Sequence, residues 1–241
     1  MNEYILETNN LCKNYKKVTV LNCVSLSVPT GSIYGLIGEN GAGKTTLFRI
    51  LAGLSYQSSG HFSMFGISSR NEVIKIRRNI GFLIETPAFY PNLSVKENLY
   101  IQQLQCYGRK NESNLFHILN LAGLNNQYHK KARSLSLGMK QRLAIAIALV
   151  GKPQLLILDE PINGLDPMGI ADLRQLLLKL NKEENVTVLL SSHILCELEH
   201  IATHFGFIHN GSLIKEISAT EIYNSAENLE QFYEELLRGV Q

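Results

Sequence analysis

Short apolar runs alternate with helix-like stretches along most of the chain. Residues 4–28 are rich in β-branched and aromatic side chains, which favours strands. Residues 31–38 form an apolar run that ends in glycine, as a buried strand does before a turn, and residues 61–65 return to a strand pattern. Between these runs, four side chains have the spacing of an amphipathic helix: Leu47, Ile50, Leu51 and Leu54. This alternation predicts an α/β fold with a mostly parallel sheet.

The middle of the chain, residues 86–150, has the pattern of helices. Ser94 and Glu97 have the spacing of a capping box, in which each side chain accepts the backbone N–H of the other residue at the start of a helix. A second apolar stripe over residues 115–122 is followed by Gly123, which suits a helix C-terminus. A helical lobe is therefore predicted inside the α/β core.

Strand patterns resume after the lobe, at residues 155–158 and 187–190, with a helical stripe between them. Two further apolar runs flank Asn210-Gly211, a dipeptide typical of a tight hairpin. The tail from Thr220 is polar and helical in pattern. The C-terminal part is therefore predicted to complete the sheet and to end in a helical appendage.

Composition and charge exclude several classes of protein. The 45% hydrophobic content over 241 residues is enough for one sizeable core. The net charge is +2 and the basic residues are scattered, so we expect no nucleic-acid partner. The N-terminus lacks the regions of a signal peptide, and no apolar stretch reaches the roughly 18 residues of a membrane helix. The four cysteines include no C-x-x-C pair, which favours reduced thiols in a cytosolic protein.

A phosphate-binding loop follows the buried strand of residues 31–38. Its motif, G-x-x-x-x-G-K-S/T, lies between a strand and an amphipathic helix and comprises Gly38, Glu39, Asn40, Gly41, Ala42, Gly43, Lys44 and Thr45. The glycines let successive N–H groups point at phosphates, and the helix N-terminus adds positive charge. Lys44 supplies a mobile charge and the Thr45 hydroxyl can ligate Mg²⁺. The sequence therefore predicts a nucleoside triphosphate and Mg²⁺ as ligands.

Two carboxylates, Asp159 and Glu160, directly follow the apolar run 155–158. Ligands of α/β sheets bind at the carboxyl ends of strands, where this pair emerges. We expect Asp159 to hold Mg²⁺, directly or through water, and Glu160 to activate the attacking water. A guanine-binding N-K-x-D element is not expected, because the nearest text, residues 181–184, has Glu in place of Asp and follows a helix.

Several further segments of the sequence, beside the phosphate loop and the acidic pair, resemble the ABC family of ATP-binding subunits. Residues 134–143 resemble the signature LSGGQ-x-x-R, residues 164–167 the D-loop, and His193 the switch histidine. Tyr15 lies where the family places the aromatic that stacks on adenine. The resemblance covers nearly the whole chain. It implies a P-loop NTPase core with a mostly parallel sheet, an N-terminal antiparallel β subdomain and an inserted α-helical subdomain.

The resemblance also implies domain limits and a mechanism. One ABC domain would span residues 1–241, with the core at 1–85 and 153–217, the helical subdomain at 86–152 and the appendage at 218–241. Two copies of the chain would pack head to tail over two ATP molecules. The signature of one chain, through Ser136 and Gly138, would bind the γ-phosphate held by the other, and Asp166 would link the two sites. In the same chain, His193 and Thr46 would join the phosphate loop around the nucleotide.

Two departures from the family pattern narrow the subgroup. The signature has Leu137 in place of its first glycine and Met139 in place of its glutamine. The Q-loop position holds Glu85, which we expect near Mg²⁺. Together with residues 85–98, these departures resemble the ATP-binding subunits of bacitracin-resistance and lantibiotic self-immunity exporters.

These motifs discriminate between three functional hypotheses. The leading hypothesis is an ATPase that energises a membrane exporter of peptide antibiotics from the cytoplasmic face of the membrane, through an integral membrane permease. A soluble ABC ATPase acting on ribosomes or DNA is disfavoured by the single domain and the absence of a heptad run. A nucleotide-binding regulator without hydrolysis is disfavoured by the presence of both Glu160 and His193. The cargo itself is not encoded in this chain.

Overall fold

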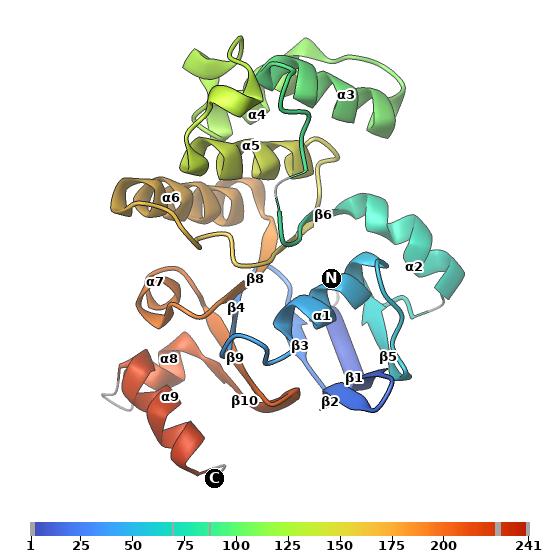
Figure 1. The fold of residues 1–241 in the computed structure, drawn as a ribbon, viewed down its shortest axis with the longest axis vertical. Coiled ribbons are helices and arrows are strands. Elements are labelled where there is room, and N and C mark those ends of the chain that lie inside the picture. Colours follow the sequence, from blue (N-terminus) through green and yellow to red (C-terminus); the bar gives the residue numbers. More distant parts are fainter. Residues whose placement is uncertain (1–2, 69, 87, 225–227, 240–241) are drawn as a thin grey trace.

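A six-stranded sheet forms the centre of the molecule, in the strand order β10-β9-β4-β8-β7-β6 (Figure 1). The computed structural model describes residues 3–68, 70–86, 88–224 and 228–239. The first five strands in chain order pair in parallel and the last pairs antiparallel with its neighbour. The six strands are β4 (Ile33–Ile37), β6 (Ile80–Leu83), β7 (Leu155–Leu158), β8 (Thr187–Ser192), β9 (His204–His209) and β10 (Ser212–Ser218). The predicted mostly parallel α/β sheet is confirmed.

A second, antiparallel sheet is built from the N-terminal part of the chain. Its strands are β1 (Tyr4–Tyr15), β2 (Val18–Val24), β3 (Ser27–Pro29) and β5 (Ser59–Met64). Helix α1 (Lys44–Ala52) packs Leu47, Phe48 and Leu51 into a core that includes residues of both sheets. This core fixes the start of α1, and with it the phosphate loop, against the end of β4.

Helices α3 (Val95–Tyr107), α4 (Glu112–Leu121) and α5 (Leu137–Leu149) form a lobe above the central sheet, next to α6 (Pro167–Glu184) (Figure 1). The capping box is present, because Ser94 Oγ accepts Glu97 N–H at 3.2 Å and Glu97 accepts Ser94 N–H at 2.6 Å. The helical pattern was expected from residue 86, but the first helix of the lobe begins at Val95. Pro91 explains part of this delay, since a proline disfavours helical backbone in the residue before it. Pro87 lies outside the described residues.

The remaining helices and turns complete the chain. They are α2 (Arg70–Ile76), η1 (Arg77–Asn79), α3 (Val95–Tyr107), α4 (Glu112–Leu121), η2 (Asn125–Gln127), η3 (Ala132–Ser134), α5 (Leu137–Leu149), α6 (Pro167–Glu184), α7 (Leu195–Glu199), α8 (Ala219–Asn224) and α9 (Leu229–Arg238). No helix in the described ranges combines the length and the apolar character that a membrane crossing requires.

The C-terminal part contains the predicted hairpin and helices. Asn210 and Gly211 have φ angles of 47° and 79°, the left-handed values that a tight hairpin turn between β9 and β10 requires. The tail is helical but not merely polar, because Leu229 and Tyr233 are buried in the main core and the Tyr233 ring stacks on Phe207 at 5.6 Å between centroids. The limits of core, lobe and appendage remain predictions, and Met1 and Gln241 lie outside the described residues.

Tyr34 ties the strand before the phosphate loop to the sheet edge. Its buried hydroxyl donates to Glu216 Oε1 at 2.7 Å, and the same oxygen accepts the Ser27 N–H at 3.0 Å. Burial, followed by the Glu216 charge, raises the pKa of Tyr34 well above its usual range, so the phenol remains a donor. We expect Tyr34→Phe to lower the free energy of unfolding by about 1–2 kcal/mol, measured by urea denaturation.

The matched control is Tyr223→Phe. The Tyr223 side chain is exposed, and its hydroxyl donates to the backbone oxygen of Glu199. This change should stay within about 0.5 kcal/mol of the unmodified protein. Equal effects of the two substitutions would contradict a special role for the Tyr34 hydrogen bond.

Candidate nucleotide-binding site

The loop between β4 and α1 surrounds a hollow of about 240 Å³, lined by Val20, residues 39–46 and Glu160. Gly41 and Gly43 have φ angles of 87° and 107°, which side chains other than glycine rarely adopt. Gly43 is the N-cap of α1 and brings no side-chain cap, so the first N–H groups of the helix are left as donors for an anion. The loop therefore has the geometry of a phosphate site.

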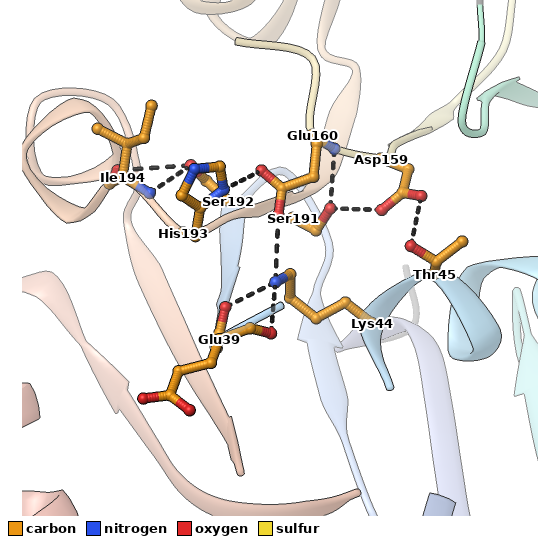
Figure 2. A network of polar contacts seen from close by, with 10 residues as sticks. Glu39, Lys44, Thr45, Asp159, Glu160, Ser191, Ser192, His193 and Ile194 are labelled. Carbon is orange, nitrogen blue, oxygen red and sulfur yellow. Dashed lines mark hydrogen bonds and ion pairs between the residues drawn. The ribbon is translucent and has the colours of Figure 1, made fainter. Parts of the chain in front are cut away.

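Lys44 is held entirely by protein groups in this structure. Its ammonium donates to the backbone oxygens of Gly38 and Glu39, at 2.6 and 3.2 Å, and lies 3.1 Å from Glu160 Oε1 (Figure 2). Lys44 is only 5% exposed, so the carboxylate of Glu160 balances a cation that water does not reach. A phosphate entering the loop would have to compete with Glu160 for this charge.

Asp159 is fixed by two hydroxyl groups. Its Oδ2 accepts from Thr45 Oγ1 at 2.8 Å, and its Oδ1 accepts from Ser191 Oγ at 2.7 Å (Figure 2). Ser191 Oγ also accepts the backbone N–H of Glu160 at 2.9 Å. One buried serine on β8 thus contacts both residues of the acidic pair, through the carboxylate of Asp159 and the backbone N–H of Glu160.

The two oxygens of Glu160 have different surroundings. Oε2 lies 2.9 Å from His193 Nδ1. Oε1 is buried beside Lys44 but has no hydrogen-bond donor in the described structure, since the contact with Lys44 is an ion pair without hydrogen-bond geometry. Glu160 also has a left-handed φ of 46°, which bends the chain directly after β7. Its carboxylate is thereby placed at the hollow with one oxygen able to accept a further hydrogen bond.

The donor set near Thr45 suits magnesium. A hydroxyl and a carboxylate oxygen are hard ligands of the kind that Mg²⁺ selects, and Mg²⁺ completes its shell with water and phosphate oxygens. The described residues contain no group of three or more His, Cys, Asp or Glu side chains arranged to hold a metal. The residues fit an ion that is shared with a phosphate ligand rather than caged by the protein.

Glu85 does not lie in this cluster of contacts. Its carboxylate forms an ion pair with the guanidinium of Arg49, on α1, and both side chains are partly exposed. The backbone of Glu85 has a φ of 63°, two residues after the end of β6. The expected position near Mg²⁺ therefore remains a prediction, which requires Glu85 to leave Arg49.

Tyr15 lies at the end of β1, where its ring is 43% exposed. The Lys13 ammonium lies 4.6 Å from the ring centroid, and the Tyr15 hydroxyl is 3.4 Å from Ser55 Oγ. An exposed ring on a hairpin is able to stack on a base. Its role toward adenine stays a prediction.

The signature residues lie at the start of α5, in the lobe rather than at the phosphate loop. Ser136 caps α5 by accepting the Met139 N–H at 3.3 Å, and Asp166 caps α6 by accepting the Gly169 N–H at 2.9 Å. A Cβ atom on Gly138 would lie 3.5 Å from Gly169 Cα, so the two helix starts are neighbours. Among the described residues, no hydrogen bond or ion pair joins them to the phosphate loop.

One side chain connects the signature helix to the acidic pair. Gln141 is buried on α5, and its Nε2 donates to the backbone oxygen of Pro161 at 3.2 Å. Pro161 directly follows Glu160. The lobe and the phosphate site are thus joined at the residue next to the candidate base.

Sequence reasoning missed two residues of this site, Ser191 and Arg49. Ser191 had a weak signal, because it is a polar residue at the carboxyl end of an apolar strand and lies two positions before His193. Arg49 had none beyond being a basic residue one turn after the phosphate loop. Both act through partners at least thirty positions away along the chain.

Comparison with known proteins assigns the family. Residues 21–163 match the family model described as ABC transporter. The chain is 43% identical to the bacitracin transport ATP-binding protein BcrA of Enterococcus faecalis, over 95% of this chain and 74% of that protein. It is 44% identical to the lantibiotic transport ATP-binding protein SrtF of Streptococcus pyogenes, over 95% and 96% respectively.

Solved structures agree with these relatives. CbiO1 of Clostridium perfringens, part of the ABC transporter complex cbiONQ, superposes with a TM-score of 0.85 at 28% identity, over 98% of this chain and 97% of that one. The dimeric post-hydrolysis state of the ATP-binding cassette MJ0796, bound to ADP and Pi, gives a TM-score of 0.79 at 27% identity, over 89% and 98%. With its phosphate loop and acidic pair, this chain belongs to the ATP-binding proteins of the ABC transporter family, which are ATPases.

Proposed function

We propose that this chain hydrolyses ATP to energise a membrane exporter of peptide antibiotics, as a subunit held at the cytoplasmic face of the membrane by a permease. The observation that supports hydrolysis is the buried Glu160 Oε1, which faces the phosphate loop and, within the described part of the chain, has an ion pair with Lys44 but no hydrogen-bond donor. The cargo class is supported by the names of the two relatives, a bacitracin and a lantibiotic transport protein.

The proposed reaction begins by breaking the Lys44–Glu160 ion pair. A bound triphosphate offers Lys44 a stronger anionic partner, so the ammonium moves to the β- and γ-phosphates. Glu160 is then free to accept a proton from a water molecule at Oε1, while His193 holds Oε2 and keeps the carboxylate oriented. Mg²⁺, held by Thr45 and Asp159, would neutralise phosphate charge.

The site of one chain is incomplete without a second copy. Ser136, Gly138 and Asp166 lie together on a surface away from their own phosphate loop, and Leu137 and Met168 are exposed there. A head-to-tail partner would bring the free start of its α5 to the γ-phosphate, where the helix N–H groups stabilise negative charge. The dimeric MJ0796 structure, bound to ADP and Pi, supports assembly of two copies with nucleotide.

The test of export is a resistance assay in cells. The gene for this chain is expressed with a candidate permease gene in a bacterium that is sensitive to bacitracin and a lantibiotic. Resistance should appear with the unmodified chain and be lost with Glu160→Gln at equal protein levels. ATP hydrolysis in vitro without any protection in cells would contradict the cargo class while leaving the ATPase in place.

Glu85 allows a sharper test of how the carboxylates divide their work. If Glu160 is the base, Glu85→Gln should keep measurable ATP hydrolysis, because an amide oxygen can still ligate a metal or water. Glu85→Ala should lose more activity, since no oxygen remains. In both variants Arg49 loses its anionic partner. Steady-state ATPase rates and ATP affinity are measured for both variants beside Glu160→Gln.

The control for Glu85 is Arg49→Gln, which removes the ion pair but leaves the carboxylate. If Arg49 only holds Glu85 away from the phosphates in the empty state, Arg49→Gln should retain hydrolysis. A Glu85→Gln variant that binds ATP but is as inactive as Glu160→Gln would show that the carboxylate at position 85 takes part in the chemistry.

A further inference from the structure

Two cysteines meet across the hairpin of β1 and β2. The Sγ atoms of Cys12 and Cys23 are 3.4 Å apart, although the residues are separated by 11 positions. The strand register shifts here, between the pairs Leu11↔Val24 and Lys13↔Leu21, and Cys23 has a left-handed φ of 50°. This irregularity turns both thiols toward each other at a place where Cys12 is partly and Cys23 largely exposed.

The two thiols are chemically unequal. The Cys23 N–H donates to Cys12 Sγ at 3.1 Å, and the Cys12 thiol donates to the backbone oxygen of Asn10 at 3.4 Å. Hydrogen bonds from Ser59 and then from the backbone and thiol of Cys23 lower the pKa of Cys12. The hydrogen bond and charge of Cys12 raise the pKa of Cys23. Cys12 is therefore the thiol that is more readily converted to its thiolate, the form that reacts with a peroxide.

We propose that Cys12 and Cys23 form a reversible thiol-oxidation site, in which a peroxide oxidises Cys12 and Cys23 then closes a disulfide between β1 and β2. The Cys12 thiolate attacks one oxygen of hydrogen peroxide, the O–O bond breaks, and hydroxide leaves and takes up a proton as water. The Cys23 sulfur then attacks Cys12, an S–S bond forms, and the S–OH bond breaks. The second water leaves with the Cys23 proton, so two electrons pass from the two thiols to the peroxide.

The site adjoins the nucleotide hollow through β2. Val20 and Leu21 are in close contact with two glycines, since a Cβ atom on Gly43 would lie 2.7 Å from Leu21 Cδ2 and one on Gly211 would lie 2.5 Å from the Val20 oxygen. Asn22 N–H also donates to the Gly211 oxygen at 2.8 Å. The sulfur atoms must approach further to bond, and a shift of β2 at this tight contact moves the phosphate loop. The disulfide should therefore weaken ATP binding, a consequence that rests on the proposed function.

The experiment uses the full chain with Cys106→Ser and Cys196→Ser, so that only the hairpin thiols remain. After treatment with hydrogen peroxide, denatured protein should lose both free thiols together, give one intrachain disulfide-linked peptide by mass spectrometry, and recover both thiols with dithiothreitol. Adding Cys23→Ser should stop the reaction at a Cys12 sulfenic acid that dimedone traps. Unlinked oxidation of the two thiols, or disulfides only between chains, would overturn the proposal.

The nucleotide consequence is measured separately, by ATP binding to the reduced and oxidised forms. The oxidised form should bind about fivefold or more weakly, and dithiothreitol should restore binding. Equal affinity of the two forms would overturn the coupling to the phosphate loop. If the reduced form binds no ATP, the proposed function fails, whereas the thiol chemistry is judged by the peptide analysis alone.

Discussion

Lys44→Ala is expected to reduce ATP turnover by about 100-fold or more and to weaken ATP binding. The substitution removes the only cation that the described structure places within ion-pair distance of Glu160 Oε1, at 3.1 Å. It also removes the charge that would follow the phosphates into the transition state, where electrostatic contributions to catalysis are largest. Steady-state phosphate release and binding of a fluorescent ATP analogue measure the two losses.

The control for this experiment is Lys182→Ala, which removes an exposed lysine from α6. It should hydrolyse ATP at the rate of the unmodified protein. Circular dichroism must show that Lys44→Ala is folded, because the substitution leaves the Glu160 carboxylate without its buried cation. Turnover by folded Lys44→Ala at the unmodified rate would refute the assignment of the phosphate loop.

Glu160→Gln should reduce the rate of ATP turnover by a factor of about 100 or more while leaving ATP binding intact. The amide keeps the shape of the side chain but cannot accept a proton from water. It also releases Lys44 from an ion pair that competes with the incoming phosphate, so ATP affinity should equal or exceed that of the unmodified chain. With hydrolysis blocked, bound ATP should hold two chains together.

Light scattering after size-exclusion chromatography, with ATP and then with ADP, measures this assembly. The dimer should appear with ATP and dissociate with ADP, and Glu183→Gln, at an exposed position on α6, should behave as the unmodified chain. A folded Glu160→Gln variant that binds ATP yet stays monomeric at high concentration would contradict a site completed by the second copy. Monomeric unmodified protein alone decides nothing, because assembly depends on concentration and bound nucleotide.

The parts of the fold and site that the sequence reveals are those encoded locally. The phosphate loop is readable because its glycines, Lys44 and Thr45 are consecutive and lie between a strand and a helix. The acidic pair is readable because two carboxylates follow four apolar residues. In the structure, direct contacts join the residues of these motifs in pairs. Thr45 contacts Asp159, and Glu160 contacts both Lys44 and His193.

The features of the fold and site that could not be predicted from the sequence depend on contacts between distant segments. Ser191 matters only because β8 lies beside β7, and Arg49 only because α1 faces the end of β6. The start of the lobe also depends on contacts that the local pattern does not show. The burial of Tyr233 is set by packing against Phe207 and not by the polar tail around it. Local patterns predict elements well, whereas side-chain partners across elements require the packed chain.

The hydrogen bond from Gln141 to the Pro161 oxygen has a consequence for the timing of hydrolysis. A rotation of the lobe would pull on the backbone one residue after Glu160, so the orientation of the proposed base would depend on that of α5. In the proposed dimer the start of α5 also faces the second copy, so docking of that copy would act on the orientation of Glu160 at the same time. A single chain with bound ATP would then not hydrolyse it, and hydrolysis would begin only when a second copy has docked on the lobe.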